Sequence, residues 1–139
     1  MKEKLFLDIS VGNTAEFEVL IDQPLLQRFV ELSGDSNPLH TDAEYAKTTS
    51  FGGVVPHGMI AGAFFSRLVG VYLPGKYALY LSQTLFFKKP MVLGHVVVVS
   101  GTVVQKVESA KVLKISTRLS DRESGVILVE GEAMVQLLK

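Results

Sequence analysis

HGMIAGAFFSRLVGVYL, residues 57–73, is the stretch that decides the fold, because it contains the longest apolar run of the sequence, Met59–Leu73. The pattern predicts a long helix beginning near His57 that is apolar nearly all round, and such a helix has to be enclosed by the rest of the protein. The run is interrupted by Ser66 and Arg67, and it is shorter than the about 20 residues that span a bilayer. The stretch therefore predicts a buried helix and no membrane segment.

The chain after this helix has the pattern of a sheet. Segments rich in β-branched and aromatic residues are separated by short turns, and they are residues 77–87, 92–107, 111–119 and 126–138. In the last segment the odd positions are apolar, whereas Glu130, Glu132 and Gln136 face away, which is typical of a half-buried antiparallel strand. A long antiparallel sheet and one apolar helix predict an α+β hot-dog fold, in which the curved sheet wraps around the helix.

The chain before the helix is expected to alternate short elements with loops. Residues 15–21 have strand spacing, and Asp22 is placed to cap a helix that ends at Ser33–Gly34. Residues 34–38 are dense in turn formers and predict a loop. Asp42 is a plausible cap for a short helix through Ala46, and residues 51–56 predict an irregular connection.

Composition sets limits on the organisation and on the partners of the chain. Its 139 residues, 47% of them hydrophobic, fit one domain over residues 1–139. The 14 basic and 14 acidic residues balance, which disfavours generic binding to nucleic acid or to a membrane surface. The absence of Cys excludes disulfides, thiol nucleophiles and cysteine metal sites. Because the N-terminus also lacks the pattern of a secretory signal, we expect a cytoplasmic protein.

Two motifs carry a family resemblance: LSGDSNPLHTD, residues 32–42, and FGGVVPHGM, residues 51–59. The first resembles the signature of the MaoC-like (R)-specific, or type 2, enoyl-CoA hydratases, which runs Ser-Gly-Asp, one variable residue, Asn-Pro, an aliphatic residue, His, and a small residue six positions later. The residues that match are Asp35, Asn37, Pro38, Leu39, His40 and Ala46. The second motif is similar to the segment that leads into the family's central helix, which usually ends in His-Gly-Met. One departure is His95, which stands where many members carry Asp.

The chemistry that this resemblance implies needs three groups. Adding water to a 2-enoyl thioester requires a base at C3, an acid at C2 and a donor for the charge that develops on the thioester oxygen. A His and a carboxylate held by an Asn-Pro turn can supply the first two roles, and Asp35 and His40 are that pair. The unpaired N–H groups at the start of the helix can supply the third.

The resemblance also implies a role for individual residues. Asp35 and His40 would be the catalytic acid–base pair, and the N–H group of Gly58 would be the oxyanion donor. Asn37 would hold the loop in register at the substrate site. Ser66 lies where family members place a small polar residue near the active site. The resemblance implies a homodimer and no cofactor.

The resemblance implies reversible hydration of trans-2-enoyl-CoA to the (R)-3-hydroxyacyl-CoA. One alternative is a dehydratase that acts on acyl-carrier-protein thioesters or on a branched acyl-CoA with the same catalytic pair. A hot-dog thioesterase is disfavoured, because such enzymes typically use an acidic residue on the central helix and none occurs between Gly58 and Tyr72. A non-enzymatic acyl-CoA-binding module would not need Asp35 and His40 together.

Purely structural interpretations stand beside these functional ones. Asp35 could serve only as an Asx-turn residue, and His40 could be a satisfied loop histidine. A metal site of His40, Asp42 and His57 lacks the spacing of known motifs, so no metal is expected. We expect His57 to cap or pack at the start of the helix, and Met59, Phe64 and Phe65 to belong to the core.

The sequence excludes a binding role for one further feature and leaves the role of another open. Gly52-Gly53 matches neither a dinucleotide loop nor a phosphate loop. Lys88 and Lys89 could contact CoA phosphates or simply face solvent, and the sequence does not choose between them and other lysines of the sheet: Lys106, Lys111 and Lys114.

Overall fold

The computed structural model describes residues 1–139. Its strands and helices in chain order are β1 (Thr14–Leu20), α1 (Gln23–Ser33), α2 (Pro38–Thr41), α3 (Ala43–Lys47), α4 (Ile60–Arg67), β2 (Ala78–Gln83), β3 (Phe86–Phe87), β4 (Val96–Val107), β5 (Val112–Asp121) and β6 (Ile127–Leu137). A π-helical turn, Leu68–Tyr72, continues α4, and short 3-10 turns occupy Phe6–Asp8 and Glu108–Ala110. None of the helices has both the length and the apolar composition that a membrane-spanning segment needs.

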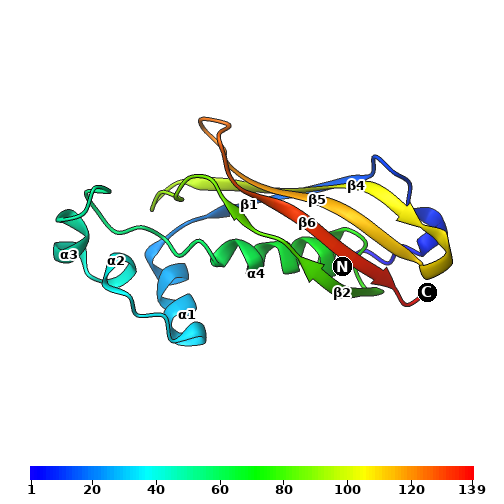
Figure 1. Cartoon of the computed structure of the whole chain (residues 1–139), viewed down its shortest axis with the longest axis horizontal. Coiled ribbons are helices and arrows are strands. Elements are labelled where there is room, and N and C mark those ends of the chain that lie inside the picture. The colour runs from blue at the N-terminus through cyan, green and yellow to red at the C-terminus, as the bar shows by residue number, and fades with distance from the viewer.

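The six strands form one antiparallel sheet in the order β1-β4-β5-β6-β2, with β3 pairing to β6 beside β2. The sheet curves over α4, which runs along its concave side, and α1, α2 and α3 gather at one end of the molecule (Figure 1). This is the expected α+β hot-dog fold. Both chain termini lie towards the other end of the sheet (Figure 1).

The core lies between α4 and the concave face of the sheet. Phe65, Leu68 and Val69 are completely buried, and inward-facing strand residues such as Val99 and Ile115 are buried with them. A methyl group added at Gly101 of β4 would lie 2.7 Å from the Leu68 side chain, so the strand packs directly against the end of the helix. Burying side chains of this size contributes about 1.5–3 kcal/mol each, which accounts for the enclosure of the apolar helix.

The central helix begins later than the sequence analysis placed it. Residues 57–59 form a turn in which Ile60 N–H bonds to the His57 carbonyl at 3.2 Å, a spacing of three residues, and the α-helix starts only at Ile60. At its other end Leu73 N–H reaches the Leu68 carbonyl at 2.9 Å, five residues back, which makes the last turn π-helical. As a result, the backbone N–H groups directly before α4 make no hydrogen bonds within the helix.

The expected strands are present with two corrected boundaries. The segment 77–87 is divided into β2 and β3, because the Thr84 carbonyl turns against Gly131 of β6 and lies 1.8 Å from where a Cβ of Gly131 would stand. The strand expected from Val92 begins at Val96, since Gly94 adopts a φ of 87° in the turn before it. Both changes occur next to the pocket described below.

The elements before α4 follow the sequence closely. Asp22 accepts a hydrogen bond from Leu25 N–H at 3.0 Å at the start of α1, and Gly34 ends this helix in the left-handed conformation with a φ of 74°. Asp42 caps α3 as expected. The loop is shorter than predicted, because Pro38 is already the first residue of α2; its fixed φ suits a first helical position.

Candidate active site

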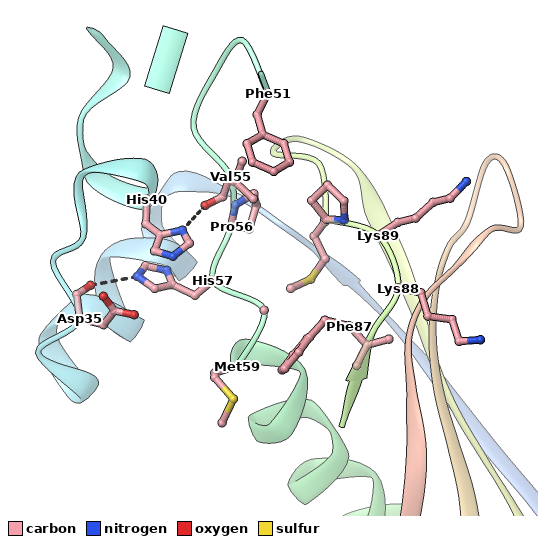
Figure 2. Close-up of a pocket in the computed structure, with 14 residues that line it drawn as sticks. Asp35, His40, Phe51, Val55, Pro56, His57, Met59, Phe87, Lys88 and Lys89 are labelled. Carbon is pink, nitrogen blue, oxygen red and sulfur yellow. Dashed lines mark hydrogen bonds between the residues drawn. The ribbon is translucent and has the colours of Figure 1, made fainter. Parts of the chain in front are cut away.

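A pocket of about 400 Å³ lies where the loop before α2, the segment leading into α4 and the end of β3 meet. Asp35, His40 and Gly58 line it together with the apolar side chains of Phe51, Met59 and Phe87 (Figure 2). The fold thus brings together, in a pocket that also has apolar walls, two motifs that are separated in the sequence.

His40 is held by its Nδ1 atom. Asn37 caps α2 by accepting Leu39 N–H at 2.9 Å, and Leu39 in turn pairs with the Val55 segment, since Val55 N–H bonds to the Leu39 carbonyl at 3.1 Å. His40 Nδ1 lies 2.5 Å from the Val55 carbonyl. A carbonyl only accepts, so Nδ1 carries the hydrogen, and in the neutral ring Nε2 is the basic nitrogen. His40 therefore has an available proton acceptor in a half-buried position.

Asp35 belongs to an exposed loop, and its side chain helps to form the turn there. Its Oδ1 accepts Asn37 N–H at 3.2 Å, as in an Asx turn, and its own N–H bonds to Ser33 Oγ at 3.1 Å. Its other carboxylate oxygen makes no hydrogen bond within the protein. The turn interpretation of Asp35 is thus compatible with a functional one, because one oxygen holds the turn and the other remains free at the pocket.

Backbone donors are available at the start of α4. The N–H groups of Gly58 and Met59 donate to no acceptor of the protein, and they precede a helix whose N-terminal end carries partial positive charge. Gly58 also packs closely, since a Cβ at this position would lie 2.9 Å from the Phe87 ring. Gly58 thus lines the pocket, has an unused N–H group and lies close to one of the apolar walls.

His57 packs against the pair, in agreement with the expectation that it packs at the start of the helix. Its side chain is 1% exposed, its ring lies 4.0 Å from the ring of His40 and 4.9 Å from that of Phe29, and its Nε2–H donates to the Asp35 carbonyl at 3.0 Å. Its Nδ1 atom is buried without a partner. Figure 2 shows the two imidazole rings one above the other between Asp35 and Val55.

Asp35, His40 and His57 each offer an atom within 4.8 Å of the others, which raises the question of a metal site. The set differs from the one considered from the sequence, which contained Asp42; that residue instead caps α3. The two imidazole planes meet at only 30° with their centres 4.0 Å apart. In-plane lone pairs in this arrangement do not converge within the about 2.0–2.1 Å that a metal–nitrogen bond requires. The geometry suits proton transfer better than metal ligation.

Two residues expected at the site lie outside this pocket. Asn37 acts on the backbone as the cap of α2, and Ser66 is exposed on the last turn of α4. Met59 was expected in the core, and this prediction is wrong: it is 56% exposed and lines the pocket, because it precedes the first enclosed turn of α4. Phe64 and Phe65 are buried as expected.

Three wall residues were missed by the sequence analysis. Phe51, Phe87 and Met91 reach the pocket from the connection before α4, from β3 and from the loop before β4. Phe51 is the first residue of the second motif, but no motif marks Phe87 or Met91, and only the tertiary arrangement brings these segments together.

The structure separates the lysines that the sequence left equivalent. Lys88 pairs with Glu130 at 2.7 Å and Lys114 with Glu132 at 2.9 Å, while Lys106 donates to the carbonyls of Phe6 and Ile9. Lys89 has no ion pair and lines both this pocket and an adjoining one of about 340 Å³. Figure 2 shows its side chain extending outward from the rim.

His95, the departure from the family pattern, forms a structural pair in the adjoining pocket. Its Nδ1 lies 2.6 Å from Asp121 Oδ2, and Asp121 Oδ1 accepts the N–H and the hydroxyl of Ser124. The Ser124 backbone N–H and His95 hold the pKa of the Asp121 carboxyl at about 2. This pair joins the segment before β4 to the end of β5 and to the turn that follows it.

The chain is similar along most of its length to known hydratases and dehydratases. An (R)-specific enoyl-CoA hydratase of Rhodospirillum rubrum is 36% identical over 95% of this chain and 90% of its own length, and a 3-hydroxybutyryl-CoA dehydratase of Methylorubrum extorquens is 31% identical over 96% and 84%. The solved structure of an unliganded (R)-hydratase of Pseudomonas aeruginosa superposes with a TM-score of 0.90 at 37% identity, covering 95% of this chain and 84% of that one. These relatives are hydro-lyases. Residues 10–123 match the model of the MaoC-like domain, and the chain therefore belongs to the MaoC-like family.

Proposed function

We propose that this MaoC-like hydratase/dehydratase of acyl thioesters adds water reversibly to trans-2-enoyl-CoA and forms the (R)-3-hydroxyacyl-CoA. The observation that carries the proposal is that Asp35, His40 with an unbonded Nε2, and Gly58 with an unused N–H line one pocket. A relative that is 36% identical along nearly the whole chain carries the same activity in its name.

In the proposed reaction Asp35 and His40 together carry out the proton transfers. Asp35 and His40 take a proton from a water molecule as its oxygen attacks C3 of the enoyl thioester. The negative charge that develops on the thioester oxygen is stabilised by the N–H of Gly58, and a proton from the pair then reaches C2. One water molecule is added, and the reverse sequence expels it. General acid–base catalysis of this kind contributes about 10²–10⁴-fold, and one oxyanion donor about 2.7–4 kcal/mol.

A direct comparison of two substrates tests whether the acyl group is carried by CoA or by an acyl carrier protein. A dehydratase of acyl-carrier-protein thioesters would use the same pair and the same donor. We expect a higher kcat/KM with an enoyl-CoA than with the same enoyl group on a carrier protein, measured at matched thioester concentration. The reverse order would favour the carrier-protein alternative, and chiral analysis of the hydrated product tests the expected (R) configuration.

Lys89 is the lysine that we expect to contact the CoA phosphates, because it is unpaired and stands at the rim of the pocket. Lys89→Ala should raise KM for enoyl-CoA up to about 5-fold with kcat unchanged, since an exposed ion pair is worth up to about 1 kcal/mol. Steady-state kinetics at low salt provides the measurement. Lys111→Ala is the matched control, because Lys111 lies in the turn between β4 and β5 at the opposite end of the sheet (Figure 1). Equal effects of the two variants would contradict this assignment.

A homodimer is the expected assembly. The strand β2 is an edge of the sheet and exposes Leu79 and Leu81, and a bare apolar edge favours pairing with another chain. Two-fold symmetry is the commonest arrangement, and we expect the thioester to bind near the subunit boundary. Light scattering at assay concentration should give twice the mass of the chain, and Leu81→Lys should shift the protein towards monomer. A fully active wild-type monomer would contradict the prediction.

A further inference from the structure

His57 occupies the position from which both members of the acid–base pair can be held. It comes directly before Gly58, it is 1% exposed, and it contacts Asp35 and His40, which lie in a different segment of the chain. Nothing in the proposed reaction requires it to exchange a proton. Its contacts nevertheless connect the three groups that the reaction uses.

The contact with Asp35 is a hydrogen bond to an otherwise loosely held loop. Asp35 bonds to Ser33 and Asn37 within its own turn, and the residues around it are exposed. The His57 Nε2–H to Asp35 carbonyl bond, at 3.0 Å, is the one hydrogen bond that Asp35 makes outside this turn. The bond therefore fixes how far the Asp35 carboxylate stands from the pocket.

The contact with His40 is between ring faces. The centres of the two rings are 4.0 Å apart and their planes meet at 30°, while the Val55 carbonyl holds one edge of the His40 ring. With one edge and one face occupied, His40 directs Nε2 towards the pocket. Phe29 of α1 supports the His57 ring from another direction at 4.9 Å, so His57 itself has little freedom to move.

The unpartnered Nδ1 atom shows that stability alone does not explain a histidine here. A buried acceptor without a donor is unfavourable, and an apolar ring of similar shape would avoid it. The only hydrogen bond that such a replacement would lose is the one to the Asp35 carbonyl, in an exposed loop where water can replace the donor. A residue chosen only for packing would thus be Phe or Leu.

We propose that His57 is a positioning residue that sets the distance between the Asp35 carboxylate and His40 Nε2, acting through its hydrogen bond to the Asp35 carbonyl and its contact with the His40 ring. The proposal rests on the proposed function, because it concerns the geometry of that reaction. Misplacement of a catalytic group by about 1 Å can lower the rate by about 10²-fold.

Three substitutions separate the two contacts. His57→Phe keeps an aromatic face for His40 and removes the donor to Asp35. His57→Gln places an amide N–H near the position of Nε2 and removes the ring, and His57→Asn places its amide nearer the position of Nδ1, where it cannot reach the Asp35 carbonyl. The Gln and Asn variants differ by one methylene group and serve as a matched pair.

We expect His57→Phe to retain the melting temperature and KM of the wild type and to lose about 10- to 100-fold in kcat with enoyl-CoA. His57→Gln should recover at least 10-fold more kcat than His57→Asn, a comparison that remains available if the Phe variant folds poorly. In an Asp35→Asn background His57→Phe should lower kcat no further, because the group that it positions is already lost.

Three results would overturn the proposal. The first is wild-type kcat in both His57→Phe and His57→Asn, and the second is a loss of kcat that is fully additive with Asp35→Asn. The third is a fall in melting temperature that accounts for the loss of activity in all three variants, which would assign His57 a structural role only. Failure of the proposed function gives a different outcome, since the wild-type protein itself would then show no turnover.

Discussion

Asp35→Asn and His40→Gln are each expected to lower kcat by at least about 10²-fold while the protein stays folded, because each removes one proton-transfer role. The structure makes Asp35→Asn a clean test, since the amide oxygen can still accept the Asn37 N–H that forms the turn. Steady-state hydration of an enoyl-CoA, together with thermal unfolding, provides the measurement.

His40 allows a sharper design than a single substitution. In His40→Asn the amide N–H stands near the position of Nδ1 and can keep the bond to the Val55 carbonyl, whereas the basic Nε2 is lost. We expect His40→Asn to be as inactive as His40→Gln. Turnover close to the wild-type value in any of these variants would refute the assignment. Acyl-CoA binding by a protein with both residues replaced and no wild-type turnover would support the binding-module alternative.

Gly58→Val is the second substitution that we expect to lower kcat strongly. Displacing the thioester carbonyl from the Gly58 N–H should remove about 2.7–4 kcal/mol of transition-state stabilisation, or about 10²–10³-fold in kcat. The structure adds a complication, because a Cβ at Gly58 also meets the Phe87 ring at 2.9 Å. The loss of kcat could then arise from a displaced wall of the pocket.

Removing the ring separates the two causes. Phe87 is 53% exposed, so Phe87→Ala should fold, and it clears the space that a side chain at residue 58 would enter. The Gly58→Val/Phe87→Ala protein should remain at least about 10²-fold below Phe87→Ala alone in kcat. If it matches Phe87→Ala in kcat and differs only in KM, the start of α4 shapes the groove and the charge is stabilised elsewhere.

Elements with a strong local pattern could be predicted from the sequence. The helix between Asp22 and Gly34 was recognisable because a capping side chain, an apolar face and a left-handed glycine all act within a few residues. The same holds for β6, where alternation separates Val129 and Val135 from Glu130 and Glu132. The bulge that also buries Leu128 next to Val129 was not visible, because it depends on how β5 pairs with β6.

Boundaries set by distant contacts could not be predicted. The break between β2 and β3 depends on Gly131, which is far away in the sequence and lies against the Thr84 carbonyl only in the assembled sheet. The late start of α4 at Ile60 likewise follows from the way the chain turns after Pro56, not from the apolar pattern, which is continuous there.

The candidate site was predictable where one motif carries it. Asp35 and His40 lie in one short stretch whose spacing is informative by itself. The apolar wall at Phe87 and the contacts of His57 were not, because both residues reach the pair from other segments, and the motif that contains His57 does not indicate which groups its side chain contacts. That Lys89 has no ion pair could not be predicted either, because only the structure shows that Glu130 pairs with the neighbouring Lys88.

The most direct test of the account is turnover of crotonyl-CoA by the purified protein, followed as the loss of absorbance of the enoyl thioester. We predict a rapid decrease to the hydration equilibrium and formation of (R)-3-hydroxybutyryl-CoA, with the rate lost in Asp35→Asn. No turnover with crotonyl-CoA or with any longer enoyl-CoA would contradict the proposed activity.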